Sequence, residues 1–185
     1  MNFFIIFLLT ITTLSANLEI NTSKLTPYDK QTIKRLNSWE AMKKSAQNET
    51  IINKLKIVNN YFNKLKYSSD IKKWKTNDYW ATPYEFLEAG SGDCEDFAIA
   101  KYFTLKELGV DENKLKLTYA KLSKDNKAHI VLSYYHKKNY IPIILDNVNK
   151  KLQISTKRKD LKELRVINKD VIYSKFKLQN NHKYN

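Results

Sequence analysis

The stretch GSGDCEDFAIAKYF, residues 90–103, contains the only cysteine among the 185 residues of the chain. That cysteine, Cys94, follows two glycines and precedes apolar residues at helical spacing that end at Gly109. The pattern predicts a helix that begins at Cys94, with Asp93 as its N-cap. The helix dipole and the free backbone amides at a helix start favour an ionised thiol. The setting therefore favours a reactive cysteine over a structural one.

A cysteine nucleophile requires a base, and three histidines are available. His136 is expected in a polar turn and His182 in the polar C-terminal tail, so we expect both to be solvated. His129 begins a predicted strand over residues 128–135, on the face of the strand that also carries Val131. The sequence therefore favours His129 as the general base.

Strand pairing predicts the group that orients this histidine. If residues 128–135 and 140–147 form a hairpin closed by a four-residue turn, His129 faces Asp146 directly. Their Cβ atoms would then lie about 5 Å apart, close enough for the carboxylate to hold one imidazole tautomer. A register slip of one residue would separate the two side chains. Cys94, His129 and Asp146 are thus predicted to form a triad for acyl transfer.

The hydrophobic periodicity changes along the chain from helical to alternating. Helices are predicted over residues 26–47, 49–67, 83–89 and 94–108. Strands are predicted over residues 115–122, 128–135, 141–148, 152–156 and 170–178. The nearly continuous apolar run at 141–148 predicts a central strand. The buried face of the first two helices is expected to carry Ile33, Leu36, Met42, Ile51, Leu55, Val58, Tyr61, Phe62 and Leu65. Helices followed by strands predict an α+β fold, with the N-terminal helices packed on an antiparallel sheet.

The N-terminus carries the apolar run FFIIFLLTITTL, residues 3–14, followed by the small residues Ser15 and Ala16. A membrane span needs roughly 20 apolar residues, so this run predicts a cleaved export signal over residues 1–16. The alternatives are an uncleaved anchor and a buried core helix. We expect residues 17–185 to form a single domain that is not embedded in the membrane. With one cysteine, no internal disulfide can form.

The formal net charge of +14 comes mainly from lysines spread over residues 24–183. No arginine-rich block and no nucleic-acid-binding motif accompanies them, so a nucleic-acid partner is not expected. The charge is typical of a solvated basic surface. The functional alternative is long-range attraction of an acidic macromolecular partner, which salt would weaken.

Three carboxylates, Asp93, Glu95 and Asp96, surround the cysteine. Like charges there raise the pKa of a thiol and oppose the helix dipole. One interpretation is that these acids simply cap the helix and complement its dipole. The other is a calcium site formed by the three carboxylates and by backbone carbonyls of residues 77–80, because calcium prefers six to eight oxygen ligands. A zinc site would need histidines or further cysteines.

The run NDYWATPYEFLEAGSGDCEDFAIAKYFTLKELGV, residues 77–110, is followed by LKLTYAK, AHIVLSYY and LDN. Together these segments resemble the bacterial transglutaminase-like cysteine proteinases, and specifically the LapG family of periplasmic proteases. The resemblance implies a papain-like fold of the transglutaminase type. It also implies that Cys94 is the nucleophile, His129 the general base and Asp146 its orienting group.

The resemblance further implies a periplasmic, calcium-binding endopeptidase. Members of the family cleave a large outer-membrane adhesin near its N-terminus at a paired-alanine site, and so disperse biofilm. The periplasmic domain of an inner-membrane cyclic di-GMP receptor sequesters them. Two alternatives remain open: a transglutaminase or deamidase that uses the same triad, and a non-catalytic binding module with the same fold.

Overall fold

The computed structural model describes residues 29–183, so the predicted signal at 1–16 lies outside the described residues. The helices are α1 (Lys30–Ala46), α2 (Ile51–Phe62), α3 (Asp70–Lys73), α4 (Pro83–Ala89), α5 (Cys94–Glu107) and α6 (Lys169–Lys183), with the short 3₁₀ helices η2 (Glu112–Lys114) and η3 (Ser155–Lys157). The strands are β1 (Lys66–Tyr67), β2 (Ser91–Gly92), β3 (Leu115–Leu122), β4 (Ala128–Tyr134), β5 (Ile143–Leu145), β6 (Gln153–Ile154) and β7 (Leu161–Val166).

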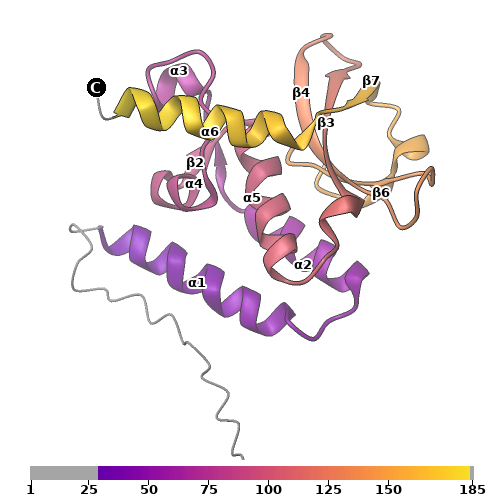
Figure 1. Ribbon diagram of the computed structural model, residues 1–185, viewed down its shortest axis with the longest axis horizontal. Helices are drawn as coiled ribbons and strands as arrows, with labels where there is room; N and C mark the ends of the chain where they lie inside the picture. The colour runs from indigo at the N-terminus through magenta and orange to yellow at the C-terminus, as the bar shows by residue number, and fades with distance from the viewer. Residues whose placement is uncertain (1–28, 184–185) are drawn as a thin grey trace, which may run out of the picture.

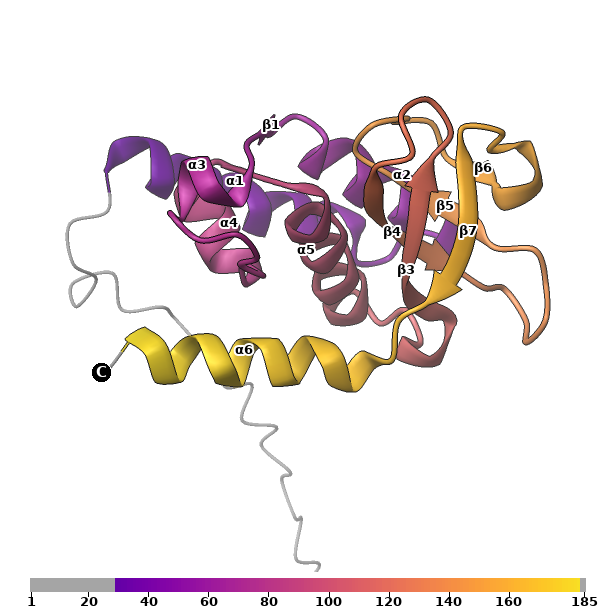
Figure 2. The same cartoon turned by 90° about the horizontal axis from the view of Figure 1, so that it is seen from above.

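The main sheet has the order β6-β5-β4-β3-β7, and each neighbouring pair is antiparallel. Figures 1 and 2 show α3 and α4 at one end of the molecule, this sheet at the other end, and α5 between them, with α6 running along the molecule toward the sheet. The predicted α+β class with an antiparallel sheet is confirmed. The apolar run at 141–148 forms β5, which lies inside the sheet between β4 and β6, while β4 is the middle strand. Only Ile143–Leu145 of that run belong to the strand.

Helix α5 lies at the centre of the molecule, where it packs against α2 and α4 on one side and against β4 on the other. The predicted buried stripe of this helix is confirmed, and it comprises Ala98, Ile99, Tyr102, Leu105 and Leu108. Partners on both sides keep water away from the helix, so polar groups along it require internal partners. The N-terminus of α5 is thereby held firmly against the start of β4.

Some local predictions are wrong. Ile33 and Ile51 are exposed, and α1 instead buries Trp39, whose indole Nε1 donates to Thr104 at 3.0 Å. Helix α1 begins at Lys30, because the side chain of Asp29 accepts a hydrogen bond from the Thr32 amide.

The segment predicted as a strand over 170–178 is helical and belongs to α6. Its β-branched and aromatic residues favour a strand by propensity. Ile172 and Phe176, however, are four residues apart and lie on one face of the helix, where they join the main core. Phe176 stacks on Phe103 of α5, so tertiary packing decides the conformation. Conversely, β7 forms from a polar stretch in which no strand was expected.

Within residues 29–183, no helix is both long and apolar enough to cross a bilayer.

Candidate active site

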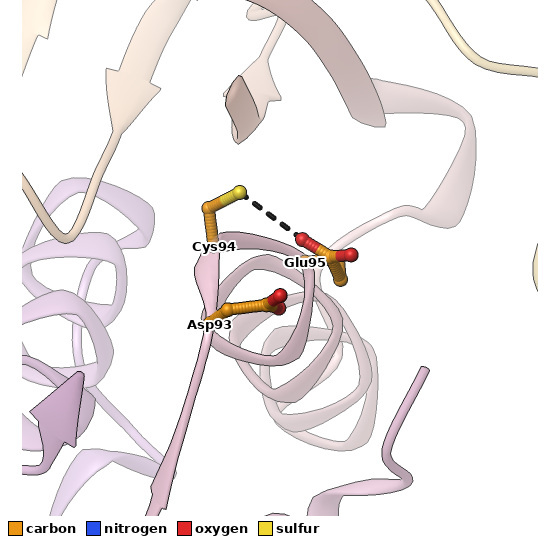
Figure 3. Close-up of side chains that lie close together, drawn as sticks. All are labelled: Asp93, Cys94 and Glu95. Carbon is orange, nitrogen blue, oxygen red and sulfur yellow. Dashed lines mark hydrogen bonds between the residues drawn. The ribbon is translucent and has the colours of Figure 1, made fainter. Parts of the chain in front are cut away.

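The single cysteine lies at the start of α5, as predicted. The short strand β2 leads into the helix, and Gly92 at its end lies directly against Asp96. A Cβ atom on Gly92 would be 2.2 Å from Asp96 Oδ2, so only glycine allows this approach without displacing the carboxylate. Figure 3 shows Asp93, Cys94 and Glu95 together at the first turn of the helix.

The Cys94 thiol points toward a carboxylate. Its sulfur donates to Glu95 Oε2 at 3.1 Å (Figure 3). Burial, followed by the charge of Glu95, raises the pKa of the thiol well above its ordinary value. A hydrogen bond from the backbone N–H of Ile130 opposes this rise. Because Ile130 follows His129 on β4, the sulfur lies beside the strand that carries the predicted base.

His129 and Asp146 are in direct contact. Nε2 of His129 lies 2.8 Å from Asp146 Oδ1, and both side chains are almost completely buried. The observed register pairs Ser133 with Ile144, two residues away from the predicted register. A two-residue shift keeps both side chains on the same face, whereas a one-residue shift would not. The predicted contact therefore forms as a diagonal neighbour pair.

The carboxylate of Asp146 also contacts groups that the sequence analysis missed. Arg158 Nη2 donates to Asp146 Oδ2 at 2.5 Å, and the Val148 amide donates to Oδ1 at 2.9 Å. Burial alone would raise the pKa of Asp146, but the hydrogen bond and charge of His129, with the other donors, hold it well below its ordinary range. The one available signal was an arginine at position 158 in a segment otherwise rich in lysine.

The three predicted metal ligands belong to a larger acidic cluster. Asp93, Glu95 and Asp96 are joined there by Asp70 from α3 and Asp78 from the following loop. Oxygens of Asp70, Asp93 and Asp96 can lie within 4.8 Å of one another, as can those of Asp70, Asp78 and Glu95. Only the folded chain brings Asp70 to α5, which is why the sequence did not indicate it.

Two oxygens of this cluster are buried without a partner. Within residues 29–183, neither Asp70 Oδ1 nor Asp93 Oδ1 has a hydrogen-bond partner. Burial raises the pKa of Asp70 to about 6 and that of Asp96 to about 8, and burial together with Glu95 raises that of Asp93. Such carboxyls are stabilised by a bound cation, and hard oxygen ligands without histidine fit calcium better than zinc. The donor set is therefore suited to a divalent cation with oxygen ligands.

Comparison with known proteins agrees with this geometry. Residues 26–160 match the family model described as bacterial transglutaminase-like cysteine proteinase BTLCP. Among solved structures, the fold is similar to calcium-bound LapG of Legionella pneumophila, with 39% identity, a TM-score of 0.71, and coverage of 77% of this chain and 78% of that chain. The EGTA-treated LapG structure gives 40% identity, a TM-score of 0.70 and coverage of 76% of each chain. No curated protein matches the chain.

The match to the family model covers more than half of the chain and includes Cys94, His129 and Asp146. The fold and the family match together define a cysteine proteinase of the transglutaminase-like class. The chain belongs to the bacterial transglutaminase-like cysteine proteinases, and the solved structures that it resembles are those of LapG.

Proposed function

We propose that the chain is an exported, calcium-dependent cysteine endopeptidase that cleaves the N-terminal region of a large surface adhesin, releases it from the cell and promotes biofilm dispersal. The observation that carries the proposal is the buried contact between His129, on the strand that flanks Cys94, and Asp146, which follows the neighbouring strand β5. Membership of a cysteine proteinase family supports the reaction class. The choice of an adhesin as substrate rests on the resemblance to the LapG family, and the 39% identity to a LapG structure supports that resemblance.

In the proposed mechanism, each residue of the triad has its own role. Nε2 of His129 is bonded to Asp146, so Nδ1 is the nitrogen left to take the thiol proton of Cys94. The resulting thiolate attacks the scissile carbonyl, and the backbone amide of Cys94 helps to stabilise the oxyanion. The imidazolium then protonates the leaving amine. Water, deprotonated by His129, hydrolyses the thioester and restores the thiol.

Calcium is the metal that we propose for the acidic cluster. Asp93, Glu95 and Asp96 would hold it, together with Asp70 and Asp78. The bound cation supplies positive charge that neutralises carboxylates beside the nucleophile. One of the similar LapG structures is calcium-bound, which supports this choice. The Cys94 thiol donates to Glu95 at 3.1 Å, so a cation bound by this carboxylate would release the thiol to donate its proton to His129.

The cellular setting is also part of the proposal. Residues 1–16 would direct the chain to the periplasm, where the substrate is the periplasmic N-terminal region of an outer-membrane adhesin. Inhibition would come from the periplasmic domain of an inner-membrane cyclic di-GMP receptor. Both partners are proposed from the family resemblance alone.

The test uses N-terminal fragments of large surface proteins from the same cell. Each fragment is incubated with the protein in calcium, in excess EGTA, and with the Cys94→Ala variant. We expect one fragment to be cut in calcium only, and mass spectrometry of its new N-terminus identifies the site. Cys94→Ala should remain folded and should not cut. Cleavage by that variant would contradict the proposal.

The same mixtures separate the alternative activities. Adding a labelled amine and a glutamine-containing substrate detects a transglutaminase, because the amine becomes incorporated without peptide cleavage. Ammonia release without cleavage indicates a deamidase. A non-catalytic binding module would show none of these reactions, and its thiol would react with iodoacetamide only as slowly as a free thiol does at neutral pH.

A further inference from the structure

Asp146 must present one particular oxygen to His129, and its side chain has two. Oδ1 lies 2.8 Å from His129 Nε2 and also accepts the Val148 amide at 2.9 Å. Oδ2 accepts from Arg158 Nη2 at 2.5 Å. Both partners of this second contact have fully buried side chains. The carboxylate therefore has three neighbouring donors, two at Oδ1 and one at Oδ2.

The guanidinium of Arg158 is itself held in place by a second carboxylate. Nε donates to Asp160 Oδ1 at 2.8 Å, and Nη2 donates to Asp160 Oδ2 at 2.7 Å. This two-point contact sets the plane of the guanidinium, because arginine presents its N–H groups in a rigid fork. Arg158 immediately follows η3, and Asp160 lies just before β7. The segment between η3 and β7 thus holds the Arg158 guanidinium in one orientation beside Asp146.

The backbone of Asp146 is anchored separately. Asn63 Nδ2 donates to the backbone carbonyl of Asp146 at 2.7 Å, and Asn63 Oδ1 accepts from the buried Lys101 of α5 at 2.9 Å. Since these contacts hold the main chain, the remaining freedom of Asp146 is the rotation of its carboxylate. Arg158 is the side-chain donor that opposes this rotation on the side away from His129.

We propose that Arg158 is a positioning residue for the triad: it occupies Asp146 Oδ2, keeps the carboxylate ionised and turned toward His129, and so leaves the histidine proton on Nε2 and Nδ1 free for the thiol. This proposal rests on the triad of the proposed function. A lysine at 158 would keep the charge but lose the two-point contact with Asp160. A neutral side chain would leave a buried carboxylate without its counter-ion.

The experiment observes the histidine directly and needs no substrate. Proteins labelled with ¹⁵N-histidine are prepared as wild type, Arg158→Met, Arg158→Lys and Arg165→Met. Arg165 is the matched control, because it lies exposed on β7 with only a 3.7 Å contact to Glu163. We expect wild type and the control to show a downfield Nε2 proton of His129 that exchanges slowly with water. Arg158→Met should lose this resonance, and Arg158→Lys should retain a broadened one.

The reactivity of the cysteine gives a second readout. At neutral pH in calcium, the alkylation rate of Cys94 by iodoacetamide should fall at least about 10-fold in Arg158→Met, because a misplaced histidine no longer takes the proton. Arg158→Lys should recover part of the rate, and Arg165→Met should keep all of it. Circular dichroism and melting curves check that each variant is folded.

Each result decides a separate question. A folded Arg158→Met protein with the wild-type resonance and rate would overturn the positioning role. If that variant does not fold, Asp160→Asn takes its place, because it loosens the guanidinium from a partly exposed position. It should speed exchange of the His129 proton, and unchanged exchange would overturn the proposal. Absence of the resonance in the wild type would instead count against the triad itself.

Discussion

Replacing Gly92 with alanine places a methyl group where the Asp96 carboxylate lies. The added Cβ would be 2.2 Å from Oδ2 and 2.9 Å from the Cβ and Cγ of Asp96, which is closer than non-bonded atoms can approach. Asp96 has no room to yield, because it is fully buried and accepts the Ala81 amide at 2.8 Å and the Asp93 amide at 3.3 Å. The added methyl group would therefore displace Asp96, a predicted calcium ligand in the first turn of α5.

The size of the effect follows from these contacts. Overpacking costs about 1–3 kcal/mol. If Asp96 is displaced, the buried Ala81 amide loses its acceptor, which costs about 1–3 kcal/mol more. Lower entropy of the unfolded chain offsets about 0.4–1 kcal/mol. We expect the free energy of unfolding to fall by about 2–4 kcal/mol, and the melting temperature by roughly 5–15 °C.

The assay is thermal melting in EGTA and in calcium. Wild type should gain stability from calcium, because a ligand that binds only the folded state raises the melting temperature. Gly92→Ala should start lower and gain little. Gly109→Ala is the control at the other end of α5, where φ is +80° and no atom lies within 4 Å, so it should cost stability but keep the calcium gain. Gly92→Ala with the melting temperature and calcium gain of wild type would refute the reasoning.

Three further predictions concern the charges of the site. Asp146→Asn should lower kcat for adhesin cleavage by about 100-fold or more with little change in KM, because the amide cannot hold the imidazolium; equal kcat values in the two proteins would contradict this. Glu95→Gln should speed alkylation of Cys94 in EGTA, because the negative charge that raises the thiol pKa is removed, yet weaken calcium binding measured by calorimetry; slower alkylation would contradict it. Burial raises the folded-state pKa of Asp70 to about 6 and that of Asp96 to about 8, above the unfolded value of about 4, so the folded protein binds more protons than the unfolded protein. The stability that these protons contribute is complete below about pH 4 and is lost as the pH rises to about 8. Melting temperatures in EGTA should therefore fall between pH 5 and about pH 8, calcium should reduce that fall, and a flat profile in EGTA would contradict the assignment.

The sequence predicted the parts of the site that depend on local pattern. Gly92, Asp93 and the apolar spacing after Cys94 predicted the helix and its N-terminal thiol, because a helix start is specified by a few adjacent residues. The parity of strand alternation placed His129 and Asp146 on one face, and that prediction survived an error of two residues in register. Parity depends only on odd or even spacing, so it tolerates such a shift.

Tertiary structure alone decided the rest. Arg158 and Asn63 approach Asp146 from distant parts of the chain, and Asp70 reaches the acidic cluster from a helix that no periodicity indicated. The C-terminal segment has the composition of a strand, but it forms α6 because in that helix Phe176 stacks on Phe103 of α5. Cys94, His129 and Asp146 could be proposed from the sequence because a helix start and strand parity are local patterns. The partners that fix Asp146 and the additional carboxylates of the acidic cluster could not, because burial and long-range contacts exist only in the folded chain.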